Sequence, residues 1–285
     1  MKKEDKLVKK VKRLLKRLGM PRWLHHFWPK TYEFYEHIVA LIVKAFCKLS
    51  YRRTKQFLEL LGKTCPSKSA LQYTAAKLTK RFWERILRTT SSDPYLVALD
   101  STGLSRTHPS YHYLKRINGK PPNMWIKLSC GFDTRKKKFC SAEVRIIPRH
   151  DSKDAKKLLS CHPKIAVADK AYNAESLYQF CAEEGILLMS PTKKNTRNAY
   201  ARKKMHKKFR ARTYNRRQLV ESSFSAVKRK FGASVSSKKC RTIKTEIYSR
   251  LICHNLFKSL YRLLGQSPNC SYLCTKQNPI RESSS

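Results

Sequence analysis

The sequence predicts an α/β protein, in which a mixed sheet is flanked by helices and preceded by a helical N-terminal region. Residues 1–90 are rich in Leu, Lys and Arg, with apolar residues spaced three and four apart, as in amphipathic helices. After the polar stretch SSDP at 91–94, short apolar runs alternate with helical patterns, which is typical of parallel strands joined by helices. Two further apolar runs, joined by the charged turn DTRKKK, indicate an antiparallel hairpin and therefore a mixed sheet.

These patterns divide the chain into a helical region at 1–90, an α/β domain at 91–264 and a polar tail at 265–285. In the first part, helices are expected over 32–49, 52–61 and 70–87. In the second part, a strand, a hairpin, a helix, a strand, a helix, a strand and two helices are expected in that order. Their ranges are 95–99, 124–132 with 139–147, 152–160, 165–168, 174–184, 186–189, 218–231 and 243–264. A basic polar segment, 192–215, separates the last strand from the last two helices.

The charge of the chain is its most unusual property. Lys and Arg number 63 against 19 Asp and Glu, which gives a net charge of +44. Such a surface repels itself unless a polyanion neutralises it, and nucleic acid is the usual polyanion. Charge alone is equally compatible with a DNA enzyme and with a ribosome-associated or merely basic protein.

Apolar segments are short throughout. The chain has no run of about 18 apolar residues, and its basic N-terminus lacks the apolar core of a signal peptide. We therefore expect a cytoplasmic protein without a membrane span. The ten cysteines are scattered and form no CxxC pair, which favours reduced core residues over a zinc site.

The second and third expected helices are joined by Gly62 and the polar stretch KTCPSKS. Helix, glycine-containing turn and helix are compatible with a helix-turn-helix, although a small helical bundle has the same pattern. The last helix of this unit would expose Lys68, Gln72, Tyr73, Lys77 and Lys80. The candidate DNA contacts of the N-terminal region are Arg52, Arg53, Lys68, Gln72 and Lys77.

Three carboxylates stand out because acidic residues are rare. Asp100 and Asp169 each follow a short apolar strand, and ligand sites of open α/β sheets collect beyond strand ends. Either one alone is more simply a turn former or a helix cap. Between Lys193 and Lys230 there are fifteen Lys or Arg and a single acid, Glu221. Alone, Glu221 is more simply an ion-pair partner, but three carboxylates together form an oxygen ligand set that suits Mg²⁺ or Mn²⁺.

The helix that carries Glu221 has two distinct faces. At 100° per residue, Val220, Phe224, Val227 and Phe231 form an apolar stripe. Tyr214, Arg217, Glu221 and Lys228 share a separate narrow face, if the helix extends back to Tyr214. A solvated face with an Arg217–Glu221 pair four residues apart is the simpler reading, but it leaves Tyr214 and Lys228 unexplained.

Three segments, VALDSTGL, VADKAYN and YNRRQLVESSFSAVKRKFG, resemble the DDE insertion-sequence transposases, which have a ribonuclease-H-like catalytic domain. The spacing around Glu221 matches the Y-(2)-R-(3)-E-(6)-K signature of one branch, with Tyr214, Arg217, Glu221 and Lys228 in place. The resemblance covers about residues 91–264 and has both aspartates in the expected order. Only 52 residues separate Asp169 from Glu221, so the long β-rich insertion of some relatives is absent.

The resemblance implies roles for these residues. Asp100, Asp169 and Glu221 would be catalytic and would ligate two Mg²⁺ or Mn²⁺ ions in each active site. Tyr214, Arg217 and Lys228 would contact DNA phosphates near the transposon end. The partners implied are double-stranded DNA, as terminal inverted repeats and as target, and a second copy of the chain in a homodimer.

Other functions remain open on the sequence alone. A catalytically inactive or domesticated DNA-binding relative would carry much of the same sequence. A ribonuclease-H-like nuclease without strand transfer would differ mainly on the Tyr-Arg-Glu-Lys face. A basic RNA-binding or ribosomal protein would share only the charge.

Overall fold

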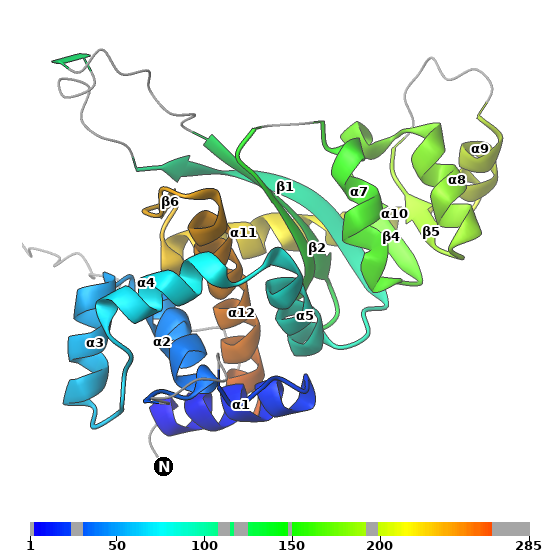
Figure 1. Cartoon of the computed structure of the whole chain (residues 1–285). Coiled ribbons are helices and arrows are strands. Elements are labelled where there is room, and N and C mark those ends of the chain that lie inside the picture. Colours follow the sequence, from blue (N-terminus) through cyan, green and yellow to red (C-terminus); the bar gives the residue numbers. More distant parts are fainter. Residues whose placement is uncertain are drawn as a thin grey trace, which may run out of the picture.

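The structure, a computed structural model, describes residues 3–23, 31–107, 115–116, 125–147, 150–191 and 199–263. Its centre is a six-stranded sheet with main order β3-β2-β1-β4-β5 (Figure 1). The strands are β1 (Leu96–Arg106), β2 (Trp125–Asp133), β3 (Lys138–Arg145), β4 (Ile165–Ala168), β5 (Leu187–Met189) and the short β6 (Ser234–Val235), which pairs with the far end of β1. β1, β2 and β3 are antiparallel neighbours, whereas β4 and β5 run parallel to β1. The predicted ribonuclease-H-like mixed sheet is confirmed.

One face of the sheet is covered by the N-terminal helices and by the last two helices of the chain. These are α1 (Lys3–Arg17), α2 (Phe34–Cys47), α3 (Tyr51–Leu60), α4 (Lys68–Lys77), α5 (Lys80–Ser91), α11 (Gln218–Phe231) and α12 (Cys240–Leu263). Ile38, Trp83, Leu128 and Tyr248 belong to one buried apolar cluster that joins these helices to the sheet. Figure 1 shows α12 running between α2 and α5, so the N-terminal helices pack around the C-terminal one.

The other face carries α7 (Ser152–Leu158), α8 (Glu175–Glu183) and α9 (Tyr200–His206), which lie together at one end of the sheet in Figure 1. Side chains alternate along β1, so Leu96 and Ala98 face the first cluster, whereas Val97 and Leu99 face this second one. The same alternation directs the next residue, Asp100, toward the face of α11 and α12.

Three elements differ from the sequence prediction. The helix expected over 70–87 is two helices, because the chain is extended at Leu78 and the Thr79 side chain accepts a hydrogen bond from Phe82 N at 3.3 Å as the cap of α5. β1 extends to Arg106 instead of ending at residue 99, because β2 and β6 supply backbone partners to its polar second half. The segment 192–215 contains α9 and α10 (Ala211–Tyr214). Residues 192–198 and the tail 265–285 lie outside the described residues.

Side chains of α12 satisfy the backbone of the edge strand β3. Asn255 Oδ1 accepts from Phe139 N at 2.9 Å, and Asn255 Nδ2 donates to Phe139 O at 2.7 Å. The Tyr248 hydroxyl donates to Ala142 O at 2.6 Å, and both α12 residues are fully buried. α12 therefore closes an edge that would otherwise present unpaired backbone groups.

We predict that Tyr248→Phe lowers the free energy of unfolding by about 1–3 kcal/mol, because the Ala142 carbonyl loses a buried donor. Chemical denaturation measures the change. Tyr73→Phe is the matched control, since Tyr73 is 66% exposed, and its effect should stay within about 0.5 kcal/mol. Equal losses in the two variants would contradict the role given to Tyr248.

Candidate active site

Two aspartates lie beside each other on neighbouring parallel strands. Leu99 on β1 pairs with Ala168 on β4, and Asp100 and Asp169 are the next residues of the two strands. Neighbouring strands are about 4.8 Å apart, so the two backbones are adjacent at this point. Asp169 has an extended backbone, which continues the alternation of β4 for one more residue. Both side chains are thereby directed to the face that carries α11.

Each aspartate also makes a local hydrogen bond. The Asp100 carboxylate accepts from Ser101 N at 2.8 Å, and the Asp169 carboxylate accepts from Lys170 N at 2.6 Å. The second bond caps the short 3₁₀ helix η2 (Lys170–Tyr172). In addition, Ser190 Oγ donates to Asp169 O at 2.9 Å and fixes this backbone to the end of β5. Asp169 therefore has the capping role that the sequence allowed. Asp100 uses one carboxylate oxygen for Ser101 N, and its other oxygen, Oδ2, faces Arg217.

Glu221 lies in the first turn of α11, directly after a tighter helical turn. α10 ends at Tyr214, a 3₁₀ turn η3 (Asn215–Arg217) follows, and α11 starts at Gln218. The α-helical face that the sequence predicts is therefore interrupted before Arg217, and η3 packs against β1 and β4. The apolar stripe of α11 is buried as predicted. A tighter turn of this kind changes the direction of its side chains relative to the helix that follows.

Arg217 connects the helix to the first aspartate. Its Nη2 lies 2.7 Å from Glu221 Oε1, and its Nη1 lies 3.6 Å from Asp100 Oδ2. The Arg217 and Asp100 side chains are each 19% exposed, whereas that of Glu221 is 52% exposed. A pair four residues apart on one helix is worth only tenths of a kcal/mol. The contact with Asp100 joins two separate elements and makes Arg217 part of a site.

The charges of the site act on one another. Burial raises the pKa of the Asp100 carboxyl, and the nearby Glu221 and Asp169 raise it further, against the Ser101 N–H and Arg217. Burial lowers the pKa of the Arg217 guanidinium, but Glu221 and Asp100 more than offset this, so its pKa lies above the usual value. Three carboxylates therefore share one neighbourhood in which Arg217 supplies positive charge.

The donor types fit a hard divalent cation, because Asp100, Asp169 and Glu221 offer only carboxylate oxygens. In the described part of the chain, no three His, Cys, Asp or Glu side chains are close enough to one another to hold a metal ion. The Arg217 guanidinium lies between Asp100 and Glu221 and pairs with both. The three carboxylates thus have the right chemistry and fold position, with a side-chain cation between two of them.

The other residues of the predicted signature lie along the same segment. Tyr214 is half-buried, its ring centroid is 5.4 Å from that of Phe209, and it contributes to the raised pKa of Arg217. Lys228 is half-buried in the last turn of α11.

The N-terminal candidates form a separate, exposed set. Arg52, Arg53, Lys68, Gln72, Tyr73 and Lys77 are all exposed. Lys80 was expected to be exposed as well, and this is wrong: it is half-buried and pairs with Glu143 and, at 3.3 Å, with Glu84. Lys80 begins α5, which packs on β3, so its environment differs from that of α4.

Tyr172 is a residue of this region that the sequence did not single out. It is 1% exposed, and its hydroxyl has no hydrogen-bond partner within the described residues. Burial raises its pKa, and the carboxylates of Asp151 and Asp100 add to that rise. The available signal was its place three residues after Asp169 in VADKAYN.

Comparison with known proteins identifies the family of the chain. A family model described as transposase DDE domain matches residues 91–256, which is more than half of the chain. The chain belongs to this family. No curated protein matches it. Among solved structures, it is similar to a cryo-EM structure of a piggyBac transposase synaptic complex with hairpin DNA, at 10% identity and a TM-score of 0.48. That alignment covers 92% of this chain and 74% of the other.

Over the residues that the structure describes, no helix is both long enough and apolar enough to cross a bilayer.

We predict that Asp100→Asn raises the free energy of unfolding of the metal-free protein at about pH 7. Because the folded-state pKa lies above the usual value of 3.8, the ionised carboxylate opposes folding, and the neutral amide removes that opposition. The gain should be complete above the folded-state pKa, shrink as the pH falls through it, and vanish below 3.8, where Asp100 is protonated in both states.

Denaturation in the presence of a chelator, repeated over a pH series, measures this gain. The exposed Asp93→Asn is the control, since it removes the same charge from open solvent. A loss of stability in Asp100→Asn at about pH 7, or a gain that does not change with pH, would contradict the electrostatic account.

Proposed function

We propose that this protein is a DNA transposase that cleaves DNA at the ends of its element and joins those ends to target DNA. The observation that carries the proposal is the pairing of Arg217 with both Asp100 and Glu221, beside Asp169 on the adjacent strand. The family of the chain supports a phosphodiester-cutting activity, because the matched domain is a transposase DDE domain. We assign the catalytic role to Asp100, Asp169 and Glu221.

The same three carboxylates would hold Mg²⁺ or Mn²⁺, with two ions in each site. When bound, such ions make the attacking oxygen nucleophilic and stabilise the leaving oxygen of a phosphodiester. Asp100 and Asp169 provide a rigid half of the ligand set, since both are fixed by strand pairing and local hydrogen bonds. Glu221 provides the adjustable half, because its side chain is half exposed at the start of α11.

We assign Tyr214, Arg217 and Lys228 to the phosphates of the transposon end. A guanidinium can bind a phosphate through two parallel hydrogen bonds, so Arg217 is suited to exchange its carboxylate partners for DNA. Lys228 adds a point charge farther along α11, and Tyr214 adds a hydroxyl before the helix.

The reaction then has two steps. Water attacks the phosphodiester at the end of the element, and the bond to the flanking strand breaks to leave a free 3′-hydroxyl. This hydroxyl next attacks a phosphodiester of the target, and one phosphodiester replaces another. We expect two copies of the chain to bridge two ends.

Residues 1–90 are proposed to bind DNA through α3 and α4. The five candidate contacts in this region are exposed, and α3 packs against α4 as in a helix-turn-helix. Lys68, Gln72 and Lys77 come from α4, which would be the recognition helix, whereas Arg52 and Arg53 come from the first turn of α3.

The catalytic assignment predicts that Asp100→Asn, Asp169→Asn and Glu221→Gln each reduce cleavage at least about 100-fold. The assay uses DNA that carries the inverted repeats flanking the gene, with Mg²⁺ or Mn²⁺ and with a chelator. DNA binding by the three variants should stay close to that of the wild type, because the carboxylates do not attract phosphate.

Glu183→Gln and Asp93→Asn are matched controls, because both residues are exposed and lie outside the site. Cleavage by any of the three variants at the wild-type rate would remove that residue from the ligand set. Cleavage without joining to target DNA would instead indicate a nuclease, and binding without cleavage would indicate an inactive relative.

The N-terminal assignment predicts a change in the salt dependence of DNA binding. Lys68→Gln and Lys77→Gln should each lower the slope of log K against log salt by about 1, since each removes one phosphate contact. Lys164→Gln, at an exposed lysine before β4, is the control and should change the slope much less. If the wild type and the three variants all show the same slope, Lys68 and Lys77 do not contact DNA phosphates.

A further inference from the structure

Two cysteines lie in contact on the face of the sheet that packs α7 and α8. Cys140 is in β3, and Cys161 ends the short 3₁₀ helix η1 (Leu159–Cys161), 21 residues later. Their sulfur atoms are 3.6 Å apart, and the Cys161 thiol is also 3.4 Å from Leu158 O. A disulfide requires about 2.05 Å, so the sulfurs need to approach by about 1.5 Å.

The surroundings allow that approach from one side only. Cys140 is 2% exposed and is held in β3 by its pairing with β2, and its thiol also contacts Gly131 O at 3.1 Å. Cys161 is half-buried at the end of a three-residue turn, and the next residue, His162, is exposed with a left-handed backbone (φ 47°). Cys161 is therefore the partner that can move.

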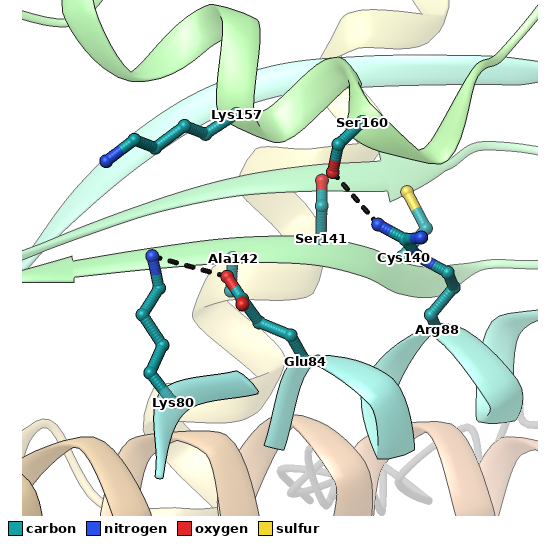
Figure 2. A pocket seen from close by; sticks show the side chains of 8 residues that line it. All are labelled: Lys80, Glu84, Arg88, Cys140, Ser141, Ala142, Lys157 and Ser160. Carbon is teal, nitrogen blue, oxygen red and sulfur yellow. Dashed lines mark hydrogen bonds and ion pairs between the residues drawn. The ribbon is translucent and has the colours of Figure 1, made fainter. Parts of the chain in front are cut away.

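A pocket that admits a small oxidant reaches Cys140. It has a volume of about 240 Å³ and is lined by Cys140 together with Arg88, Ser141, Lys157 and Ser160 (Figure 2). Figure 2 shows Cys140, Arg88 and Ser160 around this pocket, and the Arg88 guanidinium donates to Ser160 Oγ at 3.0 Å. Ser160 directly precedes Cys161, whose sulfur lies 3.6 Å from that of Cys140.

The two thiols differ in reactivity. The hydrogen bond with Cys140 lowers the pKa of the Cys161 thiol, and the positive charge of Arg88 adds to this, whereas burial opposes it. Burial raises the pKa of the Cys140 thiol well above its usual value. Because the thiolate is the nucleophile, Cys161 is the residue that attacks an oxidant.

We propose that Cys140 and Cys161 are an oxidation site at which hydrogen peroxide forms an internal disulfide. The Cys161 thiolate attacks one peroxide oxygen, the O–O bond breaks, and hydroxide leaves and takes up a proton as water. The resulting sulfenic acid is attacked by the Cys140 sulfur, its S–O bond breaks, and a second water leaves with the Cys140 proton. Two thiols and one peroxide thus give one disulfide and two waters. This site is independent of the proposed transposase activity.

The test is a peptide map of the folded, full-length protein after brief treatment with dilute hydrogen peroxide. Remaining thiols are blocked with an alkylating reagent, and the digest is analysed without reduction. We expect a cross-linked peptide pair containing Cys140 and Cys161, lighter than the two free peptides by two hydrogens and split by dithiothreitol.

Variants identify the roles of the two residues. Cys161→Ser should abolish the cross-link and leave Cys140 in the reduced form, whereas Cys140→Ser should leave Cys161 as a sulfenic acid that a dimedone probe labels. Cys181→Ser is the matched control, because Cys181 is a buried cysteine of the same core, and the cross-link should persist.

Three outcomes would overturn the proposal. They are full alkylation of both residues after peroxide, a disulfide of either one with another cysteine in similar yield, and oxidation of Cys161 to sulfinic acid without a cross-link. The map of the wild-type protein decides between these outcomes even where a serine variant fails to fold.

Discussion

The parallel pairing of β1 with β4 fixes where the two candidate catalytic aspartates lie in this molecule. Because Leu99 pairs with Ala168, the next residues of two strands that are far apart in sequence become neighbours. Both strands bury their preceding residues against helices on two faces, so a shift by one residue would exchange the side chains that pack in the two apolar clusters. The same packing that stabilises the core therefore also fixes the two aspartates. An active site built on paired strands gains this precision from the hydrophobic core.

Electrostatic repulsion among the three carboxylates is a second constraint on the candidate site. A chain with a net charge of +44 holds three carboxylates in one place, and burial disfavours the ionised form of the first of them. Arg217 offsets this cost by contacting Asp100 and Glu221 at once. Phosphate and carboxylate cannot occupy the same neighbourhood without cations between them. The site therefore requires a cation in every state, and Arg217 provides it in the structure described.

The sequence predicted the order of strands and helices and the apolar stripe of α11, because both follow from short-range periodicity. It missed the second half of β1, whose polar residues are strand-forming only through their partners β2 and β6. It also joined α4 to α5, since a single Thr cap interrupts an otherwise helical pattern. For the candidate site, the spacing around Glu221 drew attention to this segment, but the contact from Arg217 to Asp100 depends on how η3 packs against the sheet. No local pattern encodes a contact between residues more than a hundred positions apart.

The 3₁₀ turn before α11 explains how one arginine can serve two partners. In a continuous α-helix, Arg217 and Glu221 would form a surface pair of small energetic value, and Arg217 would have no reason to face the sheet. The turn lies against β1 and β4 and brings the guanidinium to Asp100, while the first turn of α11 keeps Glu221 four residues away on the helix. The tighter turn is thus the feature that places one guanidinium between the helix and the sheet. Since Glu221 stays half exposed, its pair with Arg217 can open without unfolding the core.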